Sequence, residues 1–391
     1  MGNEKNLSAL KTQLLKLSDV ELIAILRRAG VLSSEKKKTD AAPADGAARW
    51  FDRKICGLSP EAMKQLEETR SRVGVDDRVD RKWLNYAETF QRMGFEVPAW
   101  FRDEVDVRAI YRRLVDFSRA NDLPEELIAE VIPEICQYIE TGHMRPIMII
   151  GEKGSGKTTF ARMTMQEAIQ IPVETIKAPD VAGGYGLTGY CPTYRAADLG
   201  SLARAQYKNR RLVVGYLIDE IDKVTRSSNE VSIDDELLSV TDESVRTIED
   251  KYLGSVLTGL PYCPIFFTGN DFNRVNPVLA DRCKVIHYPR ATAQRIQSIL
   301  TKYVQRKLST STYSMIEFDL ALLYQSIDTL VKRSVTSLRK HQELVELVLN
   351  KAFVAAMTST EAKVRVSPAM FAEAERQIAD SEARKVGFCA A

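Results

Sequence analysis

One short segment restricts the folds open to this chain more than any other part of it. Residues 151–158 read Gly-Glu-Lys-Gly-Ser-Gly-Lys-Thr and match the pattern Gly-x-x-x-x-Gly-Lys-Thr. The apolar run 146–150 before it is typical of a buried strand, and a helical pattern follows it. A glycine-rich loop between a strand and a helix turns its backbone N–H groups inward, where they and the helix dipole bind phosphate. The segment therefore predicts a phosphate-binding loop at the edge of a parallel sheet.

The residue types in this loop each have a chemical role. We expect Lys157 to reach the β- and γ-phosphates of ATP, and we expect the Thr158 hydroxyl to bind Mg²⁺. The remaining residues that we assign to the same ATP site are Gly151, Glu152, Lys153, Gly154, Ser155, Gly156 and Thr159.

Further apolar runs follow the loop, and helical patterns alternate with them. These runs cover residues 172–176, 212–218, 264–267 and 284–288. Alternation of short buried strands with helices predicts an α/β fold in which helices cover a parallel sheet. From about residue 291 the pattern is helical, over residues 293–305, 320–331, 335–358 and 368–384.

Changes in composition divide the chain into parts. Residues 32–46 offer almost nothing to bury and are typical of a linker. Helical patterns lie on both sides of this linker, ahead of the first strand. We therefore expect a helical module over 1–31, a linker over 32–46, an N-terminal helical region over 47–118, the α/β domain over 119–290, and a helical lid with a tail over 291–391.

Polar residues lie where two of the predicted strands end. Asp219 and Glu220 follow one apolar run, and sheets of this kind bind ligands at the carboxyl ends of their strands. We expect Asp219 to organise Mg²⁺ and Glu220 to polarise the attacking water. Asn270 follows the next run and is expected to hold that water. Arg282, just before the last run, is expected to face the nucleotide of a neighbouring subunit if the protein forms a ring.

Composition limits the other functions. The 391 residues include 55 basic and 53 acidic side chains, for a formal net charge of +2. This balance argues against a strong, non-specific nucleic-acid binder but leaves room for a local basic patch. No run of about 18 apolar residues occurs, so we expect no membrane span. Six scattered cysteines and three histidines match no metal-binding pattern, and we expect a cytoplasmic protein with reduced thiols.

Taken in order, these motifs resemble a known superfamily. The loop, Asp219-Glu220, Asn270 and Arg282 are similar to the Walker A, Walker B, sensor 1 and arginine finger of AAA+ ATPases, over about residues 119–358. Within that superfamily, the stretches Leu217-Ile-Asp-Glu-Ile-Asp-Lys and Leu187-Thr-Gly-Tyr-Cys-Pro-Thr-Tyr resemble the ATPase module of Lon proteases. The fold that the resemblance implies is an αβα ATPase domain followed by a helical lid.

The resemblance also carries implications for assembly and substrate. It implies a homo-oligomeric ring, usually a hexamer, with ATP at the subunit interfaces. It further implies that Tyr194 is the aromatic residue of a pore loop that grips a polypeptide. Tyr185, in a glycine-rich stretch just upstream, is a rival for the same role.

Two departures from the Lon pattern matter. Thr336 stands where Lon-like lids have the sensor 2 arginine, and Arg339 lies one helical turn later. Because residues three apart share a helix face, Arg339 is a candidate replacement. No region with the Ser/Lys dyad of a protease follows the lid. We therefore expect ATP-driven remodelling with no protease activity of its own.

The residues thus favour a ring-forming ATPase that uses ATP and Mg²⁺ to thread or remodel a protein partner. The alternative left open is a DNA-associated AAA+ ATPase, such as a loader, a transposition regulator or a genome-defence component. Its phosphate contacts would come from basic stretches such as 204–211, and its activity would depend steeply on salt. A nucleotide-switched scaffold is disfavoured because Lys157 and Asp219-Glu220 are all present.

Overall fold

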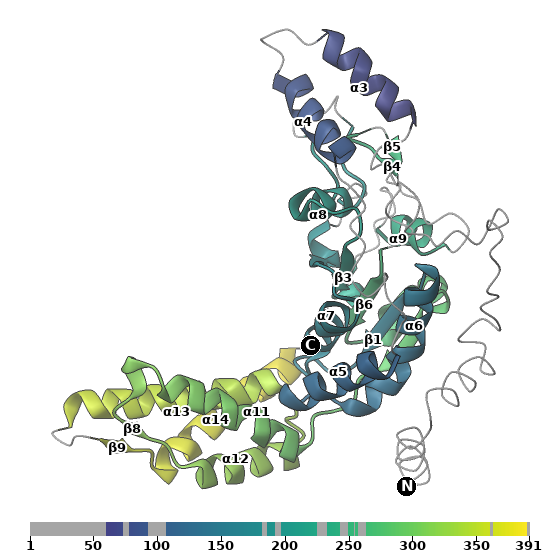
Figure 1. The fold of residues 1–391 in the computed structure, drawn as a ribbon. Helices are drawn as coiled ribbons and strands as arrows, with labels where there is room; N and C mark the ends of the chain where they lie inside the picture. The colour runs from purple at the N-terminus through teal and green to yellow at the C-terminus, as the bar shows by residue number, and fades with distance from the viewer. Residues whose placement is uncertain are drawn as a thin grey trace. The chain divides into compact units, whose positions relative to one another are not determined.

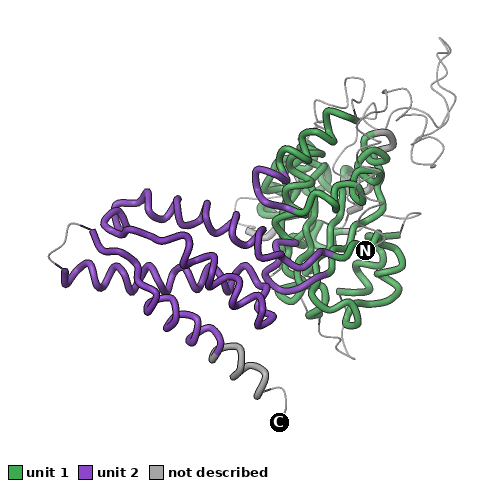
Figure 2. Tube along the Cα trace, turned by 90° about the horizontal axis from the view of Figure 1, so that it is seen from below, with its two compact units in different colours: residues 1–117, 124–150, 158–287 green, residues 118–123, 151–157, 288–391 purple. Residues whose placement is uncertain are grey.

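The computed structural model of the chain describes residues 60–72, 78–92, 107–181, 186–191, 197–224, 233–242, 249–253, 255–256, 263–359 and 363–388. It forms two compact units, which Figure 2 draws in different colours. The first unit takes in the residues up to 117, 124–150 and 158–287, and the second consists of 118–123, 151–157 and 288–391. The helical module predicted at 1–31 and the linker predicted at 32–46 lie outside the described residues.

The first unit is built on a sheet of five parallel strands in the order β2-β3-β6-β1-β7. Figure 1 labels three of these strands, β3, β6 and β1. β1 and β6 are buried along their whole length, as their continuous apolar runs predict. The α/β fold with a parallel sheet is therefore confirmed. The strands are β1 (Ile147–Ile150), β2 (Val173–Lys177), β3 (Gly215–Asp219), β6 (Ile265–Gly269) and β7 (Lys284–His287).

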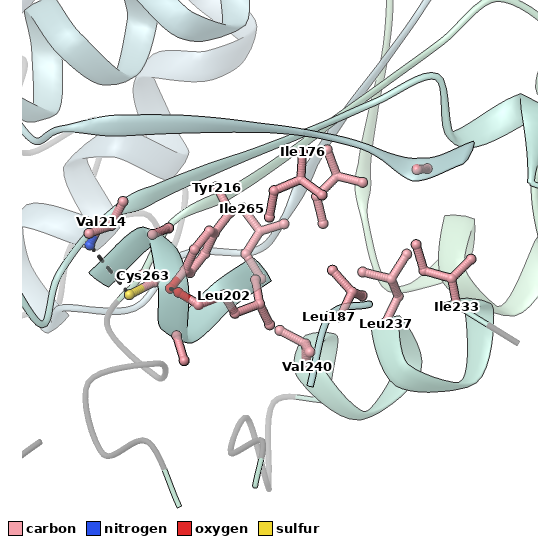
Figure 3. Packing of buried hydrophobic residues seen from close by; sticks show 14 of the residues in the cluster. Ile176, Leu187, Leu202, Val214, Tyr216, Ile233, Leu237, Val240, Cys263 and Ile265 are labelled. Atoms are coloured by element: carbon pink, nitrogen blue, oxygen red, sulfur yellow. Dashed lines mark hydrogen bonds between the residues drawn. The ribbon is translucent and has the colours of Figure 1, made fainter. Parts of the chain in front are cut away.

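Each strand lies where the sequence predicts it, and the largest shift is at the start of β3. The predicted run starts at Leu212, whereas the strand starts at Gly215. Figure 3 shows the reason: the N–H of Val214 donates to the Cys263 sulfur at 3.5 Å. The carbonyl oxygen of Leu212 accepts a hydrogen bond from the Gln206 side chain at 2.6 Å. The Val214 N–H and the Leu212 carbonyl oxygen thus form hydrogen bonds with side chains, whereas in a longer strand they would bond to the backbone of a neighbouring strand.

Helices and one small hairpin complete the first unit. The hairpin joins β4 (Glu249–Asp250) and β5 (Ser255–Val256), which are antiparallel. The helices are α3 (Pro60–Arg72), α4 (Arg78–Arg92), α5 (Val107–Ala120), α6 (Ile128–Thr141), α7 (Lys157–Met163), α8 (Ser201–Asn209), α9 (Ile233–Thr241) and α10 (Pro277–Asp281).

The core of the first unit includes residues of the N-terminal helices. Leu66 of α3 and Trp83 and Phe90 of α4 are buried in the same hydrophobic cluster as the strand residues Tyr216 and Phe267. Burying an apolar side chain of this size contributes roughly 1.5–3 kcal/mol. Helices α3 and α4 of the region predicted as 47–118 therefore share the core of the sheet.

The second unit is helical and has a core of its own. Buried residues of its helices, such as Leu300, Leu323, Leu344 and Phe371, form one hydrophobic cluster. A short parallel pair, β8 (Ile316–Glu317) and β9 (Val364–Arg365), joins two of its connections. Among the described residues, no helix is long and apolar enough to cross a membrane. The helices are α11 (Ala293–Leu308), α12 (Leu320–Lys332), α13 (Leu338–Thr358) and α14 (Pro368–Phe388).

Candidate nucleotide-binding site

The loop at residues 151–157 belongs to the second unit, and glycines give it its shape. Gly154 and Gly156 have φ angles of +75° and +107°, which residues with a β-carbon rarely adopt. A β-carbon on Gly154 would also lie 2.5 Å from the Ser337 hydroxyl oxygen. The glycine pattern in the sequence is therefore required both by backbone conformation and by close contact.

The Lys157 side chain folds back onto the backbone of its own loop. Its ammonium group is buried and donates to the carbonyl oxygens of Gly151 at 2.8 Å and Glu152 at 2.7 Å. The Ser155 hydroxyl is also buried, and no described group forms a hydrogen bond with it. Because buried polar groups are nearly always paired, an enclosed cation and an orphaned hydroxyl fit a loop that is completed by an anion such as phosphate.

Glu152 joins the loop to the helical part of the second unit. Its Oε1 lies 2.6 Å from Arg290 Nε, and its Oε2 accepts a hydrogen bond from the Thr336 hydroxyl at 2.5 Å. Thr336, which the resemblance aligns with the sensor 2 arginine, thus contacts a side chain of the phosphate loop. Lys153 and Thr159, the other polar residues predicted for this site, are exposed.

The start of α13 contacts the same loop. The N–H of Leu338 donates to the carbonyl oxygen of Gly154 at 3.2 Å. The backbone nitrogen of Arg339 would lie 3.6 Å from a β-carbon on Gly154, and its side chain is exposed. The backbone of Arg339 therefore lies beside the phosphate loop. Its role in sensing nucleotide stays a prediction.

Asp219 is the centre of the polar cluster in the first unit. It is the last residue of β3, and both of its carboxylate oxygens lie 3.4 Å from the Thr158 hydroxyl. Its Oδ1 also accepts hydrogen bonds from the Thr268 hydroxyl and, at 3.0 Å, from the N–H of Glu220. Carboxylate and hydroxyl oxygens are the donors that Mg²⁺ prefers, so this pair fits the predicted metal site.

Thr268 is missing from the residues that we assigned to the site from sequence. The strand register identifies Thr268 as a site residue, because Ile218 of β3 pairs with Phe267 of β6. The next residue on each strand, Asp219 and Thr268, therefore lies at the same edge of the sheet. The sequence contains both residues but not the information that β3 and β6 are neighbours.

Glu220 and Asn270 follow the same two strand ends. Glu220 has a φ angle of +62°, a left-handed conformation that is uncommon for a residue with a side chain. Its carboxylate forms an ion pair with Lys223 in the next turn. The Asn270 side chain donates to Asp222 at 3.5 Å. The edge of the sheet thus gathers Asp219, Glu220 and Asn270, as the sequence predicts.

Arg282 follows α10 and is held by α9 of its own chain. Its guanidinium donates to the carbonyl oxygen of Leu238, and it lies 3.6 Å from the Asp242 carboxylate. A cation is favoured at the carboxyl end of a helix, where the last carbonyl groups are unpaired. The two tyrosines predicted for a pore loop, Tyr185 and Tyr194, lie outside the described residues.

Comparison with known proteins gives the family of this site. Residues 147–291 match the family model "ATPase family associated with various cellular activities (AAA)". A Lon protease homolog of Acanthamoeba polyphaga mimivirus is 29% identical over 166 residues, which are 41% of this chain and 16% of the relative. A Lon protease of Methanosphaera stadtmanae is 23% identical over 337 residues, which are 81% of this chain and 38% of the relative. The chain thus spans less than half the length of either relative.

Solved structures show the same fold. Hsp104 with ATPγS and FITC-casein, in its closed state, has a TM-score of 0.50 and 14% identity, and covers 68% of this chain and 51% of that one. The extended S. cerevisiae Hsp104:casein complex has a TM-score of 0.53 and 14% identity, and covers 78% of this chain and 57% of that one. The phosphate loop, the acidic strand end and the parallel sheet agree with these matches: the chain contains an AAA ATPase domain at residues 147–291, related to that of the Lon proteases.

Proposed function

We propose that this chain is a ring-forming ATPase that couples ATP hydrolysis to the threading or remodelling of a polypeptide. The observation that carries the hydrolytic part is the contact of Thr158 with Asp219 at 3.4 Å. Thr158 directly follows the loop lysine in the chain, so the metal ligand and the phosphate ligand are adjacent residues.

The binding step uses the loop and the strand end. The backbone N–H groups of residues 151–157 and the Lys157 ammonium bind the phosphates. Thr158 and Asp219 hold Mg²⁺, which supplies positive charge to the phosphate oxygens. The described residues contain no group of three or more acidic, histidine or cysteine side chains that would hold a metal alone. Two oxygen donors suit Mg²⁺, which keeps water and phosphate oxygens as its other ligands.

The hydrolytic step uses Glu220 and Asn270. In this proposal the Glu220 carboxylate leaves its ion pair with Lys223 and polarises the attacking water, while Asn270 orients that water. Arg282 leaves the carbonyl of Leu238 and reaches the γ-phosphate bound by a neighbouring subunit. Phosphoryl transfer needs positioned groups and charge stabilisation more than a covalent nucleophile, which suits this set of residues.

The remodelling step rests on likeness of fold and on the loop after β2. The two solved structures described above are complexes of Hsp104 with casein. Fold likeness alone does not fix function, so we extend a hexameric ring and a polypeptide substrate to this chain as part of the proposal. Tyr194 is the residue that we propose to grip the polypeptide, with Tyr185 as its rival.

The deciding experiment traps the motor in its ATP-bound state. The Glu220→Gln protein should bind ATP, hydrolyse it at least about a hundredfold more slowly than the wild type, and assemble into hexamers seen by native mass spectrometry. Photo-crosslinking with labelled casein should mark the segment around Tyr194. Lys157→Ala is the matched control, because it should bind neither ATP nor casein. Normal turnover by the Glu220→Gln protein would remove Glu220 from the mechanism, and crosslinks elsewhere would overturn the pore-loop role.

A further inference from the structure

The loop that carries Tyr194 has a narrow base, which we call the loop neck. It consists of residues 186–190 and 198–202, which run side by side. The N–H of Tyr190 donates to the carbonyl oxygen of Asp198 at 3.2 Å. A β-carbon on Gly200 would lie 2.1 Å from a main-chain carbonyl oxygen of the opposite segment. The two segments are therefore in direct backbone contact.

Buried acidic groups hold one side of the loop neck. The Asp250 carboxylate accepts a hydrogen bond from the N–H of Gly200 at 3.0 Å. The next residue, Lys251, donates its N–H to the carbonyl oxygen of Thr188 at 2.7 Å, and the Thr188 hydroxyl bonds to Glu236 of α9 at 2.5 Å. The β4–β5 hairpin and α9 thus fix this side of the neck to the first unit.

The N-terminal helix α4 holds the other side of the neck, through Asp198. The Tyr86 hydroxyl donates to Asp198 Oδ1 at 3.0 Å. The Lys82 ammonium lies 3.2 Å from the same oxygen and donates to the carbonyl oxygen of Ala197 at 3.1 Å. One turn of α4 therefore contacts the Asp198 side chain of the neck and the backbone of the residue just before it.

Aromatic packing orients the Tyr86 side chain for this contact. Its ring meets the Tyr207 ring of α8 edge-on, with centroids 4.8 Å apart, and lies 5.8 Å from the buried Tyr252 ring. The Lys82 ammonium lies 5.4 Å from the Tyr252 ring, within the range of a cation–π contact. Edge-to-face pairs stabilise beyond simple burial, so the ring geometry limits where the hydroxyl points.

Ionisation favours the same hydrogen bond. Burial, together with the bond to Asp198, raises the pKa of Tyr86 to about 12, so Tyr86 stays a donor at neutral pH. Burial alone would raise the pKa of Asp198, but hydrogen bonds from the Leu199 N–H, Tyr86 and Lys82 outweigh it and lower that pKa. Donor and acceptor are therefore both in the form that the contact needs.

We propose that α4 is a clamp on the loop neck, in which Tyr86 and Lys82 are positioning residues that hold Asp198. The clamp thereby sets the position of the two neck segments from which the proposed substrate loop starts and ends. This inference rests on the proposed function, because it assigns α4 to the regulation of the same substrate loop.

The test measures the neck directly and then its effect on activity. Amide hydrogen exchange of the full chain, followed by mass spectrometry, reports the protected N–H groups of Tyr190, Gly200 and Ser201. In Tyr86→Phe, which keeps the ring but loses the hydroxyl, these amides should exchange about fivefold faster than in the wild type. The casein concentration that gives half-maximal stimulation of ATP hydrolysis should rise about threefold, with the KM for ATP unchanged.

Five further variants test whether the effect is specific to the contact between α4 and Asp198. Glu88→Gln changes a residue of the same helix, removes the carboxylate that pairs with Arg92 at 3.4 Å, and should leave the neck amides unchanged. Lys82→Met should act like Tyr86→Phe, whereas Lys82→Arg should retain wild-type exchange because it keeps the charge. The Tyr86→Phe/Asp198→Ala double variant should exchange no faster than Asp198→Ala alone, because Asp198→Ala already removes the acceptor of the Tyr86 hydroxyl.

Each outcome has a defined meaning. Unchanged exchange in Tyr86→Phe would overturn the clamp, whatever the ATPase does. Faster exchange with normal casein stimulation would overturn the link between the clamp and the substrate loop. Faster exchange in a chain whose wild type never responds to casein would uphold the clamp and contradict the proposed remodelling function. The failure of the inference and that of the function are therefore distinguishable.

Discussion

Two loops of this protein are each tied to the rest of the molecule by a carboxylate, but in opposite ways. Glu152 of the phosphate loop reaches outward, its side chain 39% exposed, to Arg290 and to the Thr336 hydroxyl. Asp250 reaches the loop neck from the interior, is 1% exposed, and accepts three backbone N–H groups, from Gly200, Tyr252 and Leu253.

The difference in burial between Glu152 and Asp250 shows that the contact of the phosphate loop can be exchanged more easily than that of the loop neck. An exposed ion pair contributes little to stability and is easily replaced by water or by another charge. A buried carboxylate that satisfies several N–H groups leaves them all unpaired when it is removed. We therefore expect Glu152 to influence how the nucleotide binds and Asp250 to influence whether the first unit stays folded.

The largest expected effect comes from Asp250→Ala, which leaves three N–H groups without their acceptor. At pH 7 it should lower the free energy of unfolding by about 4 kcal/mol. Chemical denaturation followed by tryptophan fluorescence measures this, since Trp83 lies in the core of the same unit. Asp116→Ala, at an exposed position of α5, is the control and should stay within about 0.5 kcal/mol of the wild type. Equal losses in the two variants would remove the distinction between buried and exposed carboxylates.

A smaller effect should follow pH. Burial raises the pKa of Asp250 from its ordinary value of 3.8 to about 6, and the nearby Asp198 carboxylate adds to the rise, against the three hydrogen bonds from N–H groups. Between these two values the folded state binds the proton more tightly than the unfolded state. The stability contributed by this group is therefore fully present below about pH 4 and is lost as the pH rises to about 6, by on the order of 2 to 3 kcal/mol. Comparing Tm against pH for the wild type and Asp250→Asn isolates this contribution; equal slopes would contradict it.

The smallest effect on stability, and the most informative on binding, concerns the exposed pair. Glu152→Gln removes a negative charge from the phosphate loop and should tighten ATP binding about threefold. Arg290→Met leaves that charge uncompensated and should weaken binding by a similar factor, while both variants keep the wild-type Tm within about 2 °C. Titration with a fluorescent ATP analogue measures the affinities. Shifts of the same sign would show that Glu152 does not act through its charge.

The phosphate loop could be predicted because its chemistry lies in adjacent residues. The Gly-x-x-x-x-Gly-Lys-Thr pattern requires positive φ angles at Gly154 and Gly156 and a strand before it, and the structure has both. Asp219 was predictable for the same reason, since it directly follows an apolar run. Asn270 lies three residues after the run 264–267, and Thr268 is the first polar residue after that run.

The contacts that position these residues could not be predicted, because they join distant parts of the chain. Thr268 meets Asp219 only because β3 and β6 are neighbours in the sheet. Glu152 meets Thr336 across 184 residues, and Tyr86 meets Asp198 across 112. No local pattern records such pairs, since each residue alone is an ordinary polar side chain.

The backbone contact at the loop neck limits how far the segment between its two paired residues can reach. Only seven residues, 191–197, lie between the paired residues Tyr190 and Asp198. A chain spans at most about 3.4 Å per residue, so a loop of seven that starts and ends at one point reaches no further than about 12 Å from it. In the proposed function, bending of this segment alone carries its tip at most about 24 Å from one extreme to the other, which is roughly seven residues of an extended polypeptide. Any longer advance requires the first unit itself to move.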